Sequence, residues 1–355
     1  MNFLLFIFLI SGGLIIYTSV IYYFILRVFK QNNYEKNEKF LPEITLIISA
    51  YNEEKCIDTK LQNTQTLDYP HEKLQVILAD DGSTDKTVEL AKRYKFVEIL
   101  ELDRGGKTNA QNEAVKIAKN EILVFSDANN VYKKDALKKL VRNFVDDRIG
   151  VVCGELQYNH KHSKENTYWR YEVAIKKAES KNGWLIGANG SIYAVRKNAY
   201  VTLPVDSISD HLEPIKVYGQ GLDVVYEPEA IAIEDAPMEV LSRKRRIILR
   251  SLVSMKYITD QLNPFKQRSI FIPYVSHKLI RWFLPFLMLL CLLSTIYLSI
   301  DSDVFKLLLI IQILFYISGI FFSGVRYIII VNVASALAIM DWTLGKKQTI
   351  WNVAR

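Results

Sequence analysis

Apolar runs alternate with helical patterns between residues 41 and 155. Four runs are long and apolar enough to be buried strands, at residues 44–49, 76–79, 97–100 and 122–126. The segments between them carry apolar residues at spacings of three and four, as in an amphipathic helix. Continuous apolar strands that alternate with helices are typical of a parallel sheet covered by helices on both faces. The pattern therefore predicts an α/β fold.

Polar residues follow three of these strands at the point where each strand ends. They are Asn52 and Glu53 after the first strand, Asp80 and Asp81 after the second, and Asp127 and Asn129 after the fourth. Each group alone is also explained as a turn or a helix N-cap. Ligands of such sheets bind beyond the carboxyl ends of the strands, so three polar tips at one edge favour a binding site.

Both ends of the chain are far more apolar than its middle. The first 29 residues contain one charged residue, Arg27, and their apolar stretch exceeds the ~20 residues that cross a bilayer. Its length and the lack of a preceding Lys or Arg favour an uncleaved anchor over a cleaved signal peptide. Residues 282–300 and 305–323 are two further predicted spans, joined by an acidic turn at 301–303. The apolar stretch at 327–340 is short for a span and is predicted to lie in the interface or to re-enter.

These features divide the chain into five parts and predict a multi-pass protein of the plasma (inner) membrane. Lysines that closely follow the first span place the α/β domain in the cytoplasm by the positive-inside rule. The parts are an N-terminal transmembrane anchor (1–30), the cytoplasmic α/β domain (41–238), amphipathic interface helices (239–281), two transmembrane helices (282–324) and an interfacial or re-entrant C-terminal segment (325–355).

Charge and cysteine content exclude some classes of partner. The formal net charge is +7, and the basic residues concentrate near the membrane-proximal segment. This distribution favours contact with anionic membrane lipid and disfavours nucleic acid as a partner. The three cysteines, Cys56, Cys153 and Cys291, show no paired spacing. Neither a disulfide framework nor a zinc site is therefore predicted.

Four motifs identify a family. LIISAYNEE, ILADDGSTDKT, RGGKTNAQNEAV and FSDAN occur in this order. Together they resemble the family-two glycosyltransferases with the GT-A fold, a Rossmann-like nucleotide-diphospho-sugar transferase domain. These inverting, nucleotide-sugar-dependent enzymes include the synthases of cellulose, hyaluronan and many bacterial surface polysaccharides. The resemblance covers residues 41–250, and the flanking membrane segments match the membrane-bound branch of the family.

The resemblance implies a nucleotide-sugar donor, with UDP as the favoured nucleotide, bound at the strand tips. The residues implied in nucleotide binding are Ala50, Asn52, Glu53, Asp80, Asp81, Lys107 and Asp127. Lys107 follows two glycines and begins a predicted helix, so its ammonium and the free backbone amides would face a pyrophosphate.

Asp127 and Asn129 match the family's metal-binding Asp-x-Asp motif, with the last acid replaced by an amide. They would hold Mg²⁺ or Mn²⁺, which neutralises charge on the leaving nucleoside diphosphate. The amide of Asn129 carries no net charge, and fewer charged ligands mean weaker capture of the metal. We therefore expect the metal to bind mainly as a complex with the donor.

Inverting transfer needs one general base that takes a proton from the acceptor hydroxyl. In the family this base lies in an acidic pair that opens a helix, and the matching residue is Asp210, with Ser209 where an acid is usual. A helix cap is the alternative interpretation of Asp210, and Glu213 is the next candidate for the base.

Two further segments resemble family motifs. Residues 184–190 resemble the glycine-containing acceptor loop, in which Gly187, Asn189 and Gly190 would let the backbone approach a sugar closely. Arg243 and Arg246 lie on a predicted amphipathic helix, where processive synthases carry Gln-x-x-Arg-Trp. Arg246 matches the family arginine, and both arginines are candidates for gating or phosphate contacts or for contact with anionic lipid. The missing Trp argues against long-chain processivity.

The function expected from these features is that of a membrane-bound inverting hexosyltransferase. It would move a sugar to a saccharide or lipid-linked acceptor in cell-surface polysaccharide synthesis. A sugar nucleotidyltransferase is one alternative, because such sheets host either reaction. A non-catalytic membrane partner of another synthase is a second, disfavoured because Asp81, Asp127 and Asp210 are all present. Three spans are few for a polymer channel, and a homo-oligomer or a synthase complex stays open.

The distribution of Lys and Arg generates a prediction of topology, with the N-terminus outside and the α/β domain and C-terminus in the cytoplasm. A cysteine introduced at Ser302 should react with a membrane-impermeant thiol reagent added to intact cells. Cysteines introduced at Ser163 and Lys347 should react only after permeabilisation. Labelling of the Ser163 variant in intact cells would invert the whole arrangement.

Overall fold

The computed structural model of the protein describes residues 2–29, 31–159, 166–235, 239–265 and 270–346. Within these ranges the strands are β1 (Ile44–Ala50), β2 (Leu74–Asp80), β3 (Val97–Glu101), β4 (Ile122–Asp127), β5 (Asn130–Tyr132), β6 (Ile149–Tyr158), β7 (Tyr193–Arg196) and β8 (Asp223–Glu234). The helices of the α/β domain are α3 (Ile57–Gln65), α4 (Thr87–Ala91), α5 (Lys107–Ile117), α6 (Ala136–Val141), α7 (Asn166–Ser180) and α8 (Ser209–Gly219). The flanking helices are α1 (Asn2–Ile16), α2 (Tyr22–Val28), α9 (Val240–Ser254), α10 (Phe271–Tyr274), α11 (Ile280–Leu298), α12 (Asp303–Phe321) and α13 (Ser323–Thr343).

The strands form one eight-stranded sheet in the order β3-β2-β1-β4-β7-β6-β8-β5. The first four are parallel, as the alternation of strands and helices predicts. The other half is mixed, because β7 runs antiparallel to β4 and β6, and β5 runs antiparallel to β8. The strands of this half were not among those that the sequence pattern predicted. Only a few residues separate β4 from β5, too few for a crossover helix, so β5 pairs with the distant β8 instead.

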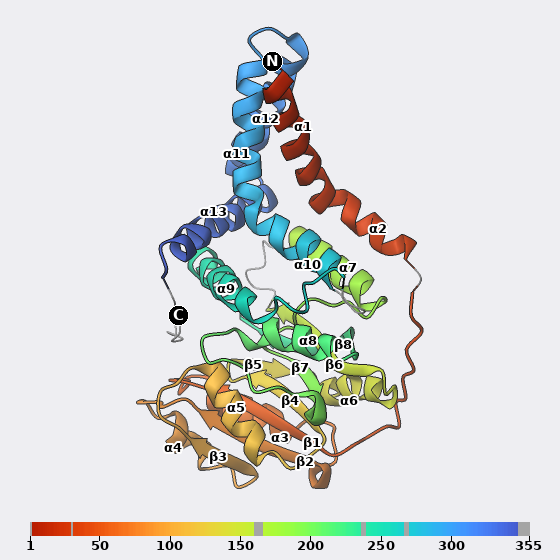
Figure 1. The fold of residues 1–355 in the computed structure, drawn as a ribbon. Coiled ribbons are helices and arrows are strands. Elements are labelled where there is room, and N and C mark those ends of the chain that lie inside the picture. Colours follow the sequence, from red (N-terminus) through yellow and green to blue (C-terminus); the bar gives the residue numbers. More distant parts are fainter. Residues whose placement is uncertain (1, 30, 160–165, 236–238, 266–269, 347–355) are drawn as a thin grey trace.

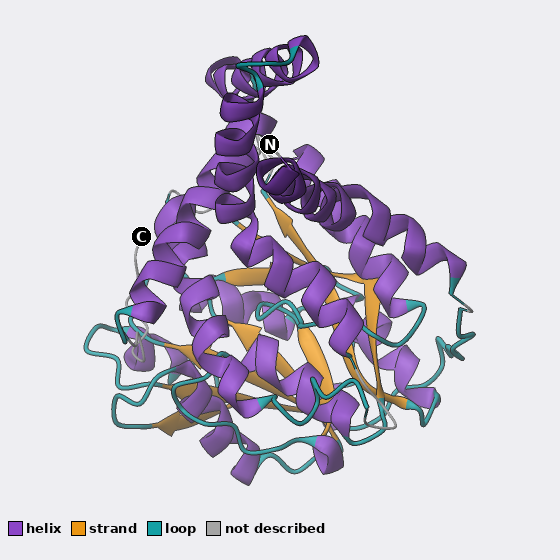
Figure 2. Cartoon of the chain, turned by 45° about the horizontal axis from the view of Figure 1, so that its top comes forward, coloured by secondary structure: helices purple, strands orange, loops and turns teal. Residues whose placement is uncertain are grey.

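Helices cover both faces of this sheet (Figure 2). Alternate residues of β1 point to opposite faces, because side chains along a strand alternate. Leu46 and Ile48 join a buried cluster with α3 and α6, whereas Ile47 joins a second buried cluster with α5, α8 and α9. Burial on both faces is the reason that the strands are continuous apolar runs.

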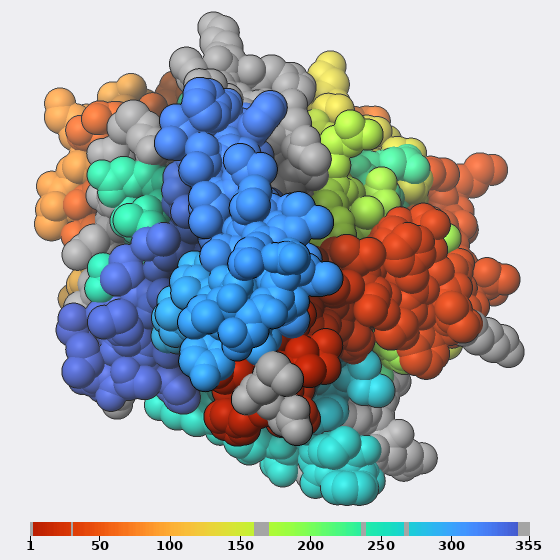
Figure 3. Space-filling view, turned by 90° about the horizontal axis from the view of Figure 1, so that it is seen from above, coloured from red at the N-terminus to blue at the C-terminus, as the bar shows by residue number. Residues whose placement is uncertain are grey.

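The flanking helices rise from one side of the α/β domain (Figure 1). Among the described residues, four helical stretches are long and apolar enough to cross a membrane, at Phe3–Val28, Phe271–Leu298, Asp303–Phe321 and Ser323–Thr343. Segments from both ends of the chain lie side by side in the view from above (Figure 3), where α1 packs against α11.

The fourth of these stretches, α13, is a helix of 21 residues, longer than the 14-residue apolar run that the sequence suggested. In Figure 1 it lies lower than α11 and α12, and it packs along α9 of the membrane-proximal region. Asp341 near its end forms an ion pair with Arg245 of α9 at 2.5 Å. Its interfacial placement stays a prediction.

A buried polar network joins the N-terminal helix, α7 and the turn that leads into α11. His277 lies between two carboxylates, with Nδ1 at 2.8 Å from Glu179 and Nε2 at 3.1 Å from Glu172. The Tyr22 hydroxyl donates to the same oxygen of Glu179 at 2.9 Å, and Arg281 forms an ion pair with Glu172. The network therefore fixes α7 of the α/β domain to helices from both ends of the chain.

Candidate active site

The strand register brings the predicted tips together. Ala50 at the end of β1 is level with Asp80 on β2, and the neighbouring Ser49 is level with Asp127 on β4. The carboxyl ends of three strands thus carry polar groups at one edge, as the sequence predicts. Asn129 follows directly in the turn between β4 and β5.

The loops after β1 and β2 are tied to each other. Asn52 has a φ of +52°, and its side-chain oxygen accepts from the Thr84 amide at 2.8 Å. The Asn52 amide donates to the Ser83 hydroxyl at 2.9 Å, and the Ser83 amide donates to Asp80 at 2.9 Å. Burial raises the pKa of Asp80, and these Ser83 contacts oppose the shift. Asn52 and Asp80 therefore shape the loops, and their predicted nucleotide contacts stay predictions.

Asp81 is buried beneath the loop that precedes α5. One carboxylate oxygen accepts from the backbone amides of Gly105 and Gly106, both at 2.8 Å, and the other forms an ion pair with Arg104. The Arg104 guanidinium in turn lies 3.3 Å from the centre of the Tyr51 ring. A nucleobase that is to bind at Asp81 must therefore displace or share Arg104, which the sequence analysis did not single out.

Glu53 also points inward. It is 1% exposed, and its carboxylate accepts from the Cys56 thiol at 2.8 Å. Its backbone amide donates to the Thr87 hydroxyl at 2.7 Å, which links the β1 tip to the start of α4. The side chain of Glu53 thus stabilises this corner of the site from within.

Lys107 and Asp127 form an ion pair at the centre of the site. Lys107 is the first residue of α5, preceded by Gly106 with a φ of +91°, so it projects from the helix N-terminus as predicted. Its ammonium also lies 3.4 Å from the Gly190 carbonyl oxygen. The predicted phosphate-facing lysine, the predicted metal ligand and the predicted acceptor loop therefore meet here.

Asp210 lies in the first turn of α8, against the same loop. A Cβ atom added to Gly190 would be 2.8 Å from the Asp210 carboxylate and 3.0 Å from the Lys107 ammonium, so a larger residue would displace these two groups. The Ala188 amide donates to the Asp210 carbonyl at 2.6 Å. Burial raises the pKa of Asp210, and the nearby Lys107 opposes the shift. Gly187 has a φ of +89°, which a glycine adopts at little cost.

Asn189 is turned away from this space. Its amide nitrogen donates to the Gly154 carbonyl oxygen at 2.5 Å, and its oxygen accepts from Lys176 at 2.7 Å. The side chain therefore holds the loop to β6 and α7, and any contact of position 189 with an acceptor would come from the backbone.

Glu213, the alternative base, lies one turn after Asp210 and faces the core. It accepts from the Tyr193 hydroxyl at 3.0 Å, while its other oxygen is buried without a partner among the described residues. Burial raises the pKa of Glu213 to about 8, so this carboxyl is protonated at neutral pH. A protonated acid cannot accept a proton, which favours Asp210 as the base.

Arg243 and Arg250 of α9 reach the site, and Arg250 is buried. Arg243 lies 3.6 Å from Glu234, the last residue of β8. Arg250 is 8% exposed and donates to the Ser207 carbonyl oxygen just before α8. Burial lowers the pKa of Arg246, with Arg243 adding to the shift. The helix thus faces the α/β domain as well as the membrane side.

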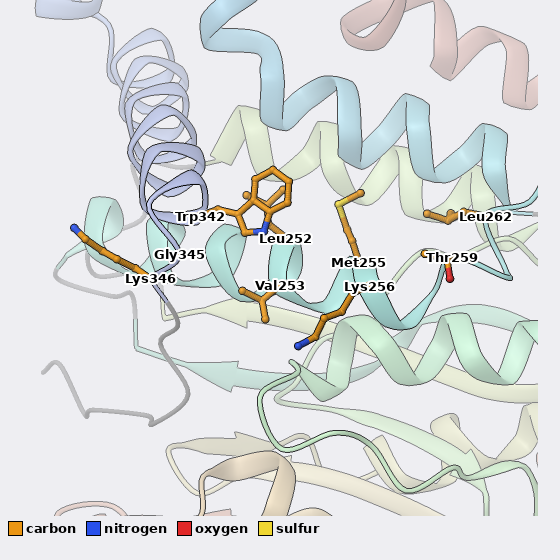
Figure 4. Close-up of a pocket in the computed structure, with 9 residues that line it drawn as sticks. All are labelled: Leu252, Val253, Met255, Lys256, Thr259, Leu262, Trp342, Gly345 and Lys346. Carbon is orange, nitrogen blue, oxygen red and sulfur yellow. The ribbon is translucent and has the colours of Figure 1, made fainter.

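A cavity of about 520 Å³ lies outside this cluster, between α9 and the end of α13 (Figure 4). Its lining is mainly apolar and includes Leu252, Met255 and Trp342. Its two lysines, Lys256 and Lys346, form ion pairs with Asp206 and Asp341. The cavity contains none of the strand-tip acids and is separate from the candidate active site.

The site has the chemistry of a hard-cation site but supplies few ligands. Asp127 offers a carboxylate and Asn129 an amide oxygen, the ligand types that Mg²⁺ and Mn²⁺ accept. Within the part of the chain that the structure describes, no group of three or more acidic, His or Cys side chains could hold a metal ion. The residues therefore fit a divalent cation that brings further oxygens with it, such as those of a diphosphate.

The chain is similar to known glycosyltransferases in fold and in sequence. The mannosyltransferase PcManGT from Pyrobaculum calidifontis, solved in complex with GDP-Man and Mn²⁺, superposes with a TM-score of 0.73 at 20% identity, over 93% of this chain and 99% of that one. The α/β domain thus has the GT-A fold. Residues 45–200 match the sequence model of Glycosyl transferase family 2. This part of the chain is therefore similar to the family-two glycosyltransferases.

Curated relatives are synthases of a bacterial polysaccharide. Poly-beta-1,6-N-acetyl-D-glucosamine synthase from Staphylococcus aureus (strain COL) is 29% identical over 248 residues, which are 65% of this chain and 59% of the relative. The synthase of the same name from Staphylococcus epidermidis gives the same identity and the same shares. The matched part spans about three fifths of the length of these relatives.

Lys60 is a buried lysine, not expected from the sequence, that contacts residues at the end of β4. Lys60 of α3 donates to the Ser126 hydroxyl at 2.7 Å and to the Asn130 side-chain oxygen at 2.8 Å, and it lies 4.0 Å from the centre of the Tyr132 ring. Asn130 in turn donates to the Asp127 carbonyl at 3.0 Å. Burial lowers the pKa of Lys60 to about 7, and Asp127 opposes the shift.

This pKa predicts a rise of stability with pH. Above about pH 7 the folded protein holds Lys60 neutral, whereas an unfolded lysine stays protonated to about pH 10.4. The unfolded state then binds more protons, so the free energy of unfolding contributed by this group rises from about pH 7 to about pH 10. Melting temperatures measured across this range should rise less steeply for Lys60→Met than for the wild type. The exposed Lys55→Met serves as a control, and equal slopes for all three proteins would contradict the prediction.

Proposed function

We propose that the protein is a membrane-bound inverting glycosyltransferase. It moves a sugar from a nucleotide-sugar donor, with UDP as the favoured nucleotide, to a saccharide or lipid-linked acceptor in cell-surface polysaccharide synthesis. The observation that carries the proposal is the convergence of Lys107, Asp127 and Asp210 around Gly190. A phosphate-binding cation, a metal-binding acid and a base thus lie within one small space.

The reaction assigns a role to each of these groups. The acceptor hydroxyl oxygen attacks the anomeric carbon of the donor sugar, and its proton passes to the Asp210 carboxylate. The bond from that carbon to the phosphate oxygen breaks, and the nucleoside diphosphate leaves with the electron pair. Lys107 stabilises the negative charge that develops on the diphosphate. A divalent cation held by Asp127 and Asn129 would supply further neutralisation there.

The names of the relatives support a first choice of sugar. Both staphylococcal relatives are named as synthases of an N-acetylglucosamine polymer, so UDP-N-acetylglucosamine is the first donor to test. Gly187 and Gly190 would line the acceptor side, and Arg243 and Arg246 would contact diphosphate or anionic lipid from α9. Membrane lipid, and a homo-oligomer or synthase complex, complete the proposed partners.

The four long apolar helices support an integral membrane location. We place the catalytic domain in the cytoplasm on the distribution of Lys and Arg. The contact of α13 with α9, and the Arg245–Asp341 pair at its end, support the interfacial placement of the C-terminal segment.

Ligand-induced stabilisation tests the proposed donor and metal. A ligand that binds only the folded state raises the melting temperature by mass action. Among a panel of UDP- and GDP-sugars, at least one should raise the melting temperature of the purified protein with Mn²⁺ or Mg²⁺, and a chelator should reduce the rise. Asp127→Ala should nearly abolish both this response and sugar transfer. Full transfer activity in the presence of the chelator, or in Asp127→Ala, would remove the metal from the proposal.

The role of Asp210 predicts a separation of turnover from binding. Asp210→Asn should lower turnover by roughly 10²–10⁴, while the donor still raises the melting temperature as in the wild type. Because the base must be deprotonated and its pKa is raised by burial, wild-type turnover should fall with decreasing pH at a pKa above that of an ordinary aspartate. Glu213→Gln is the matched control on the same helix. Retention of more than about a tenth of normal turnover by Asp210→Asn would place the base elsewhere.

A further inference from the structure

Glu234 is an acid of the site that the sequence motifs do not reveal. It is the last residue of β8, and β8 pairs with β5 in a register that sets Glu234 opposite Asn130. This pairing carries Glu234 to the turn that holds Asp127 and Asn129, although the two segments are far apart in the chain. Its side chain is largely buried, with 8% of the residue exposed.

One carboxylate oxygen of Glu234 contacts the turn between β4 and β5, and the other contacts Ser191, just before β7. The Asn129 amide nitrogen donates to Oε1 at 3.1 Å, and the Ser191 hydroxyl lies 3.2 Å from Oε2. The same hydroxyl lies 3.4 Å from Oδ2 of Asp127. One small hydroxyl group therefore lies between the carboxylates of Asp127 and Glu234.

This spacing suits a shared cation. Ligand oxygens lie about 2.1 Å from Mg²⁺, so two oxygens of one coordination sphere are roughly 3–4 Å apart. The carboxylates of Glu234 and Asp127 both contact the Ser191 hydroxyl, at 3.2 and 3.4 Å, and a shared cation would draw them closer together. The contact with Glu234 uses the side-chain nitrogen of Asn129. It does not involve the side-chain oxygen, the atom that would bind a metal ion.

The charge at this position depends on nearby cations, because burial raises the pKa of Glu234 and Arg243 opposes the shift. A buried carboxylate next to a second acid is costly unless cations compensate it, and a glutamine would hold Asn129 and Ser191 equally well. The compensating cations lie on the site side, where Arg243 is 3.6 Å from Glu234 and Lys107 pairs with Asp127. These are the residues that a diphosphate would draw toward itself, which would leave both acids to a metal.

We propose that Glu234 supplies the second carboxylate of the donor site, in the role of the acid that Asn129 replaces, and faces the divalent cation together with Asp127. This inference rests on the proposed function. It changes the charge count expected from the sequence, because the protein then offers two acids to the metal, from β4 and from β8.

A charge swap tests the proposal without relying on catalysis. The measured quantity is the Mn²⁺ concentration that gives half of the maximal rise in melting temperature at a fixed UDP concentration. Glu234→Gln keeps the hydrogen-bond acceptor and removes the charge, so it should raise this concentration about tenfold or more. The double variant Asn129→Asp/Glu234→Gln returns one acid to the pair and should lie within about threefold of the wild type. Glu229→Gln, on the same strand but away from the site, should leave the value unchanged.

The outcomes separate the inference from the proposed function. If neither UDP nor GDP stabilises the wild type in a Mn²⁺-dependent way, the proposed donor and metal fail, and the role of Glu234 fails with them. If the wild type responds and Glu234→Gln responds equally, the inference alone is overturned and Glu234 is a structural residue. If Glu234→Gln does not fold, the double variant decides, and a Mn²⁺ requirement more than about tenfold above the wild type overturns the inference.

Discussion

The parallel pairing of β1 with β2 and β4 is the constraint on which the site depends. A one-residue slip in either register would exchange the side chains of β1 between two buried clusters, Leu46 and Ile48 for Ile47, so the close packing of both clusters fixes the pairing. The same register makes the three strands end together, which brings Ala50, Asp80 and Asp127 to one edge. The position of the polar tips is thus set by the packing of apolar side chains behind them.

Acids at this edge pair with basic side chains. Arg104 pairs with Asp81, Lys107 with Asp127 and Arg243 with Glu234. Each cation comes from a loop or helix that borders the site, so the protein carries its positive charges at the place where a diphosphate would bring negative ones. Groups fixed in advance in this way stabilise developing charge with little reorganisation. In the proposed function, a diphosphate would take these cations over from the acids.

The sequence predicted the parts of this arrangement that depend on local pattern. The apolar runs identified the first four strands, and the order of motifs identified Lys107, Asp127 and the fold. It did not predict the mixed half of the sheet or the arrival of Glu234 beside Asn129, because both depend on pairing between strands far apart in the chain. Lys60 was missed for a related reason, since an isolated lysine in a helical pattern is normally a solvent-exposed residue.

The network of Tyr22, Glu179 and His277 has a consequence for modularity. α7, which carries Glu179, leads directly into the loop of residues 183–190 beside Asp210. Removal of the anchor helices would leave buried carboxylates without their partners, at a cost of about 3–5 kcal/mol for a broken buried pair. The α/β domain is therefore not independent of the flanking helices. The network connects the loop of residues 183–190 to helices from both ends of the chain, so a truncation of the N-terminal helix would also disturb that loop.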